Sequence, residues 1–136
     1  MGDNKWEVTE RRRWGRRDVS IEAKMQILSR SATPQISRME EVLVTNISMM
    51  GVCIRSPSIS IDDLHVVGAL SEESWMPNLV NLEFTLPTSP PRRVRFMGTV
   101  EWYHRIGKGA HYSMGVSIDI ISPEDKRRLE QFLEED

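Results

Sequence analysis

The sequence predicts a mainly β domain: a six-stranded antiparallel β-barrel with one C-terminal α-helix. Two observations lead to this prediction. Apolar and polar side chains alternate with period two over much of the chain, as they do in strands that bury one face. After residue 121 the apolar spacing changes to that of a helix. Several short strands followed by a single helix are typical of a small barrel or sandwich that the helix covers.

The expected strands follow one another along the chain. In residues 19–28 the apolar side chains run from Val19 to Ile27 at every second position. Shorter segments at residues 42–47 and 52–55 come next. The alternation then returns in three longer segments, at residues 79–86, 94–102 and 112–120. Turn residues at positions 87–91 and 107–109 separate these segments.

The final segment carries the signals of an amphipathic helix. Ser122 is the expected N-cap and Pro123 occupies the first helical position, with acidic residues in the first turn. Leu129, Phe132 and Leu133 have helical spacing. Residues 56–78 are long for a hairpin connection and acidic, and they form either a helical turn or an ordered insertion.

Length and composition indicate one domain. The chain has 136 residues, of which 39% are hydrophobic, and a formal net charge of -2. We expect residues 1–9 to be a flexible N-terminal arm and residues 10–136 to be a single domain. Cys53 is the only cysteine, and no apolar run matches a transmembrane helix or a signal peptide. These features favour a cytoplasmic protein without membrane insertion.

Signatures of catalysis and metal binding are missing from the sequence. His65, His104 and His111 have no ligand spacing with one another or with Cys53, so we expect no metal site. No glycine-rich segment ends in Lys followed by Ser or Thr ahead of a helix, as a phosphate-binding loop does. We therefore expect a protein that is not an enzyme, with no catalytic residues and no cofactor.

Residues 10–17, "ERRRWGRR", hold five arginines in seven positions directly ahead of the first expected strand. Such a run is often only a solvated basic arm. Arginine, however, presents a planar fork that binds phosphate or a guanine edge in bidentate fashion and stacks on bases. Trp14 stacks on a base or anchors the arm to the barrel. The use of arginine without lysine points to a nucleotide ligand.

A second polar segment lies between two expected strands. In "NISMMG", residues 46–51, Asn46 offers an amide and Ser48 a hydroxyl. Gly51 gives a backbone that can adopt a positive φ or approach a ligand closely. Alone, this segment is an ordinary hairpin turn.

Together, these two segments resemble the PilZ family of cyclic di-GMP receptors. That family has Arg-x-x-x-Arg before its first barrel strand and Asp/Asn-x-Ser-x-x-Gly some tens of residues later. This chain has Arg12 and Arg16, followed by Asn46, Ser48 and Gly51. The segments "GTVEWY" and "YSMGVSI" and the helix "SPEDKRRLEQFL" extend the resemblance over residues 10–133.

The match has one alternative register and two departures. Arg13 and Arg17 also have the motif spacing, but Arg12 and Arg16 are preferred because the family places an aromatic residue where Trp14 stands. Ser113 stands where the family commonly has glycine, and residues 56–78 exceed the usual connection.

The resemblance implies a receptor for cyclic di-GMP. Arg12 and Arg16 would bind phosphates and guanine edges, Asn46 and Ser48 would bond to the ligand, and Gly51 would shape the turn. Arg11 would contact a second ligand molecule. The neighbouring residues Arg13, Trp14 and Arg17 would support the site. Ligand binding would order the arm and signal to an unidentified effector protein.

Two other functions fit the same fold. Some PilZ-like domains of motility and type IV pilus systems are protein-interaction adaptors that do not bind the dinucleotide, and the acidic segment at residues 56–78 would then be a partner site. A small nucleic-acid-binding barrel is less favoured, because the strands lack a row of exposed aromatic residues. We therefore expect neither DNA nor RNA as a partner.

Overall fold

The computed structural model describes residues 15–31, 33–68, 76–109 and 111–135. These residues form ten strands and one helix. The elements are β1 (Arg17–Leu28), β2 (Glu40–Ile47), β3 (Gly51–Ser56), β4 (Ser60–Ile61), β5 (Leu64–His65), β6 (Leu79–Leu86), β7 (Arg92–Gly98), β8 (Val100–Ile106), β9 (His111–Ser117), β10 (Ile120–Ile121) and α2 (Pro123–Glu134).

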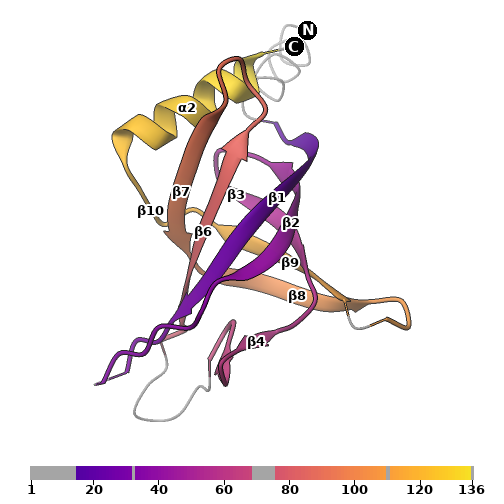
Figure 1. Ribbon diagram of the computed structural model, residues 1–136, viewed down its shortest axis with the longest axis vertical. Helices are drawn as coiled ribbons and strands as arrows, with labels where there is room; N and C mark the ends of the chain where they lie inside the picture. Colours follow the sequence, from indigo (N-terminus) through magenta and orange to yellow (C-terminus); the bar gives the residue numbers. More distant parts are fainter. Residues whose placement is uncertain (1–14, 32, 69–75, 110, 136) are drawn as a thin grey trace, which may run out of the picture.

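Eight of the strands form one antiparallel sheet in the order β10-β7-β6-β1-β2-β3-β9-β8. The remaining two, β4 and β5, form a separate hairpin. Within the large sheet β7 and β8 lie near opposite ends, yet Thr99 alone separates them in the chain. One residue cannot bridge a flat sheet of this width, so the sheet curls into the barrel-like shape seen in Figure 1. The prediction of a mainly β, barrel-like fold is therefore confirmed.

The core lies inside the curled sheet. In β1, β6 and β7 alternate side chains point inward, and the register places Ala23 of β1 between Val42 of β2 and Phe84 of β6. Met25, Ile27 and other inward residues are fully buried. Burial of these apolar side chains, at roughly 25 cal/mol per Å², stabilises the curled sheet. The period-two pattern of the sequence therefore corresponds to one buried face and one outer face.

The predicted number of six strands is wrong, because the main sheet contains eight. The predicted strand 94–102 is divided at Thr99 into β7 and β8, and the predicted strand 112–120 into β9 and β10. Gly98 and Val100 are both buried. The alternation therefore continues through the corner at Thr99, and the sequence pattern does not indicate that the strand ends there. After β9, the N–H of Asp119 donates to Met97 O at 3.0 Å, which directs the chain toward β7.

The described part of residues 56–78 contains a short hairpin and no helix. Its turn residues Asp62 and Asp63 have φ of 52° and 68°, as a two-residue hairpin turn requires. The Arg38 backbone N–H donates a hydrogen bond to the Asp62 carboxylate at 2.7 Å. This hydrogen bond, together with the nearby Arg38 guanidinium, lowers the pKa of Asp62. Ile61 and Val66 belong to the core, so this hairpin packs on the barrel. Residues 69–75 lie outside the described residues.

The predicted C-terminal helix is confirmed with its cap. The Ser122 side chain accepts a hydrogen bond from the Asp125 N–H at 3.1 Å, and Pro123 begins α2. Leu129, Phe132 and Leu133 are buried, and α2 lies along β7 (Figure 1). In the described part of the chain no helix has the length and apolarity needed to cross a membrane.

Candidate functional site

Four of the residues singled out in the sequence line one cavity of about 280 Å³ on the outer face of the sheet. Arg16 lies just before β1, Asn46 is in β2, Ser48 is in the β2–β3 connection, and Gly51 is the first residue of β3. The rest of the wall comes from the β2–β3 connection and from β3, β8 and β9; its residues are Met50, Val52, Cys53, Glu101, Trp102, Gly115, Val116 and Ser117. Two segments distant in the sequence therefore meet in one place.

The strand register explains why this cavity is on the outer face. Asn46 pairs with Cys53, Cys53 with Gly115, and Gly115 with Trp102. Residues that face one another across neighbouring strands share a face of the sheet. Their neighbours Ile54 and Met114 are fully buried on the opposite face. The cavity therefore spans β2, β3, β9 and β8 from the solvent side.

Ser48 holds the turn that carries the second motif. Its hydroxyl donates to Gly51 O at 3.1 Å and accepts from the N–H groups of Met50 at 3.1 Å and Gly51 at 3.2 Å. A hydroxyl has one donor and two acceptor sites, so these bonds use its full capacity. In the structure Ser48 thus shapes the turn that lines the cavity, and the bond to the ligand expected from the sequence stays a prediction.

Gly51 is required by a close approach of two strands. A Cβ at this position would lie 2.4 Å from the backbone oxygen of Val116. The described glycines with positive φ are Gly68 and Gly107, so Gly51 does not supply a left-handed turn. Its small size instead lets β3 approach β9 along the cavity. This contact between strands differs from both reasons considered from the sequence, a positive φ and a close approach to a ligand.

Arg16 and Asn46 present polar groups to the cavity. Arg16 is exposed, and its side chain forms no ion pair with any acidic group in the described part of the protein. Asn46 is half-buried in β2, where it pairs with Asp18 across β1 and with Cys53 across β3. A guanidinium and an amide on one wall can together bind an anionic, hydrogen-bonding ligand.

Arg17 has a structural position away from this cavity. Its Nη1 donates to Phe132 O at 2.6 Å and Glu135 O at 3.3 Å, and its guanidinium lies 4.2 Å from the centre of the Phe132 ring. A cation that binds the last carbonyls of a helix stabilises its C-terminus. Of the two neighbouring arginines, the structure therefore places Arg16 at the cavity and Arg17 against α2.

The rest of the predicted arm lies outside the described residues. This applies to residues 1–9, expected as a flexible arm, and to the candidate site residues Arg11, Arg12, Arg13 and Trp14. Their roles stay predictions.

Sequence reasoning missed the wall formed by β8 and β9. Trp102 lies across Gly115 so closely that a Cβ on Gly115 would be 2.1 Å from the indole Nε1. Glu101 and Ser117 complete this wall. A glycine at an outward position of a strand indicates a close neighbour, and Gly115 carries that signal. Finding the neighbour itself requires the β8–β9 register.

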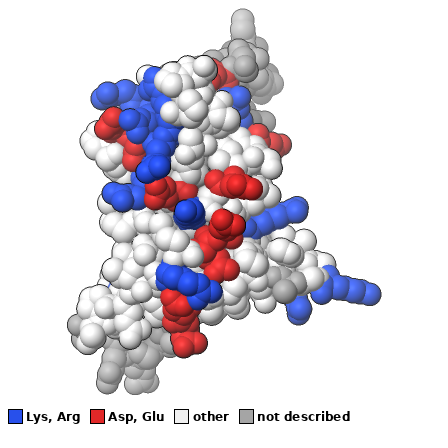
Figure 2. Space-filling model, viewed as in Figure 1, with Lys and Arg blue, Asp and Glu red and all other residues white. Residues whose placement is uncertain are grey.

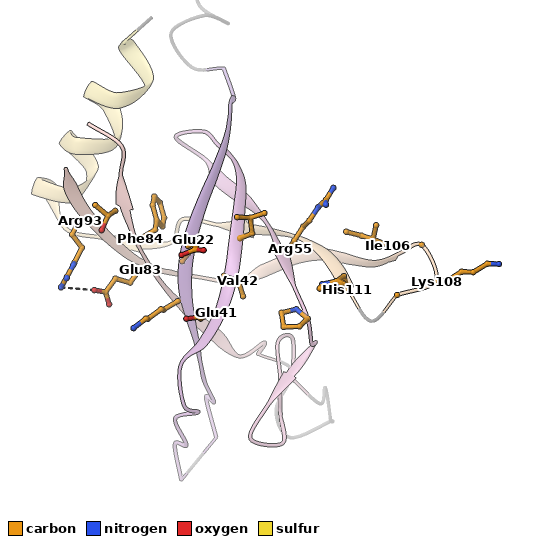
Figure 3. Close-up of a pocket in the computed structure, with 17 residues that line it drawn as sticks. Glu22, Glu41, Val42, Arg55, Glu83, Phe84, Arg93, Ile106, Lys108 and His111 are labelled. Atoms are coloured by element: carbon orange, nitrogen blue, oxygen red, sulfur yellow. Dashed lines mark ion pairs between the residues drawn. The ribbon is translucent and has the colours of Figure 1, made fainter. Parts of the chain in front are cut away.

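A larger cavity of about 940 Å³ lies elsewhere on the outer face. Figure 3 shows its side chains spread across the sheet from Arg93 to Lys108. Its carboxylates Glu22, Glu41 and Glu83 alternate with basic residues, and Arg93 pairs with Glu83 at 3.3 Å. Figure 2 shows acidic and basic groups interspersed on the molecule. A binding site needs a few polar groups that converge, so the smaller cavity is the better candidate despite its size.

Comparison of the sequence with protein-family models and with curated proteins found no match. Among solved structures, the chain is similar to the "Structure of Bacillus subtilis Inhibitor of motility (MotI/DgrA)", with a TM-score of 0.60 and 18% sequence identity. The similarity covers 88% of this chain and 48% of that one, so the chain spans about half the length of MotI/DgrA. At this level of identity the likeness shows a common fold.

Proposed function

We propose that this protein is a PilZ-like receptor that binds cyclic di-GMP at the cavity around Arg16, Asn46 and Gly51. The observation that carries the proposal is the convergence of both motif segments on this one cavity. Cyclic di-GMP has two phosphates and two guanines, so its binding site needs a cation, directional polar groups and flat apolar surfaces.

Each of these groups is present in the cavity wall. Arg16 supplies a guanidinium for a phosphate or for the O6/N7 edge of guanine. The Asn46 amide supplies both donors and an acceptor. The Trp102 indole, 41% exposed, supplies an aromatic surface against which a base can pack. The arginines at positions 11–13, close in sequence to Arg16, would add cationic groups for the phosphates.

In this proposal the protein acts by binding a ligand rather than by catalysis, and it passes the signal to another protein. MotI/DgrA, which has the same fold, is an inhibitor of motility. We therefore propose a cytoplasmic adaptor whose arm changes geometry when cyclic di-GMP binds and whose effector belongs to a motility system. Differential affinity of the ligand for the ordered arm would drive the change.

Calorimetric titration of the purified protein with cyclic di-GMP tests this function. We expect saturable binding of cyclic di-GMP, and no comparable heat with GTP, which carries one guanine and lacks the cyclic backbone. A stoichiometry of two ligand molecules per chain would agree with a contact from Arg11 to the second molecule. If cyclic di-GMP gives no binding, the receptor function is wrong, and the dinucleotide-independent adaptor takes its place.

A further inference from the structure

The candidate site contains a carboxylate that phosphate binding does not explain. Glu101 is the acidic residue among the described residues that line the cavity, and its side chain is exposed. None of the ion pairs between described residues includes it. A carboxylate repels the phosphates of a dinucleotide. Its presence in the same cavity as Arg16 therefore indicates a ligand that also brings hydrogen-bond donors.

Among the described residues, the carboxylate of Glu101 keeps capacity to accept further hydrogen bonds. Its contact in the described structure is with Thr99 Oγ1 at 3.5 Å, the limit for a hydrogen bond. Thr99 Oγ1 makes shorter contacts, at 2.9 Å with Ser117 Oγ and 3.1 Å with Asp119 Oδ2. The hydroxyl has one proton to donate, and the closer acceptors compete for it. Glu101 is thus available to donors in the cavity.

A bulge in β8 directs Glu101 to this position. Val100 pairs with Val116 and Trp102 pairs with Gly115, so Glu101 is an extra residue without a partner in β9. In a regular strand Glu101 and Trp102 would point to opposite faces. Here both line the same cavity. Bulges re-aim side chains in this way beside binding sites.

Among nucleotide bases, guanine matches a carboxylate best. Its Watson–Crick edge presents the N1–H and the 2-amino group side by side, and a carboxylate can accept from both. Adenine presents an acceptor, N1, at the corresponding position, so a carboxylate is repelled there. Asn46 is an amide and can bond to either base, and therefore it does not provide this distinction. The charge of Glu101 does.

We propose that Glu101 reads the Watson–Crick edge of one guanine and thereby makes the site selective for guanine dinucleotides over adenine dinucleotides. This inference rests on the proposed function. A site built to bond particular polar groups of a ligand discriminates strongly against an analogue that leaves them unpaired. The selectivity comes from a repulsive contact with adenine as much as from an attractive one with guanine.

The test is calorimetric titration of the wild-type protein and the Glu101→Gln variant with cyclic di-GMP and with cyclic di-AMP. Glutamine keeps the shape of the side chain but offers one donor and one acceptor, which match adenine N1 and its 6-amino group. We expect the variant to bind cyclic di-GMP about 10- to 100-fold more weakly, because it loses the hydrogen bonds from guanine to a charged carboxylate. Its affinity for cyclic di-AMP should rise.

Glu22→Gln is the matched control, because Glu22 is exposed on β1 and does not line this cavity. It should leave both affinities unchanged. Equal weakening of both dinucleotides by Glu101→Gln would overturn the inference, since Glu101 would then position the arm rather than read a base. Unchanged affinities would overturn it as well. If the wild type binds neither dinucleotide, the proposed function fails first, and the inference falls with it.

Discussion

Replacing Arg16 with alanine should remove most of the affinity for cyclic di-GMP, a loss of about 100-fold or more. Arg16 is the one basic residue among the described residues of the cavity wall. A guanidinium that binds a phosphate or a guanine edge makes charge-assisted hydrogen bonds, each stronger than a neutral one. Two such bonds at about 1.5 to 3 kcal/mol each account for the loss. Calorimetric titration of the variant measures it.

Arg55→Ala provides the control for this substitution. Arg55 is exposed on β3, within the same sheet, but it lines the larger cavity. Its replacement should leave the affinity for cyclic di-GMP unchanged. Because Arg16 is exposed and precedes the first strand, both variants should keep the circular dichroism spectrum of the wild type. Equal affinities of Arg16→Ala and the wild type would place the ligand elsewhere on the protein.

Gly98→Ala should destabilise the fold by about 3 kcal/mol or more, which lowers the midpoint of thermal unfolding by roughly 10 °C. A Cβ on Gly98 would lie 1.6 Å from the backbone oxygen of Ser117 and 2.8 Å from its carbonyl carbon. These are backbone atoms, which a rotamer change cannot move aside. They also lie at the corner where the chain passes from β7 to β8 and the sheet curls. The strain therefore falls where it cannot be relieved locally.

The comparison is with Gly109→Ala in the β8–β9 connection. A Cβ on Gly109 would lie 3.7 Å from His111, an ordinary contact, so this variant should change the unfolding midpoint little. Differential scanning calorimetry of both variants gives the two midpoints. Similar midpoints for Gly98→Ala and the wild type would mean that β7 and β9 are not packed as closely as described.

The barrel-like fold could be predicted because its signals are local. Period-two alternation identifies strands such as β1 and β6, and the Ser122 cap identifies the helix, with no knowledge of what packs against them. The division at Thr99 could not be predicted in this way. Both Gly98 and Val100 face the core, so the apolar pattern is the same for a straight strand and for one that turns the corner. That difference depends on which strands pair.

The part of the candidate site that the two sequence motifs form could be predicted. Asn46, Ser48 and Gly51 lie within six consecutive residues around the β2–β3 turn, and the spacing of the arginines identified Arg16. The opposite wall could not be predicted, since Glu101 reaches the cavity only through a bulge that appears in the β8–β9 register. The role of Ser48 also depended on the fold. Its three hydrogen bonds within the turn follow from backbone geometry that residue types do not specify.

The most direct test of the central claim, that cyclic di-GMP binds at this cavity, is a two-dimensional ¹⁵N–¹H NMR titration of the labelled protein with cyclic di-GMP. The account predicts that the largest shifts occur at the backbone amides of Asn46 and Gly51 and at the Trp102 indole N–H. The amides of Glu83 and Arg93, at the larger cavity, should not move. Shifts centred on the larger cavity, or none at saturating ligand, would contradict it.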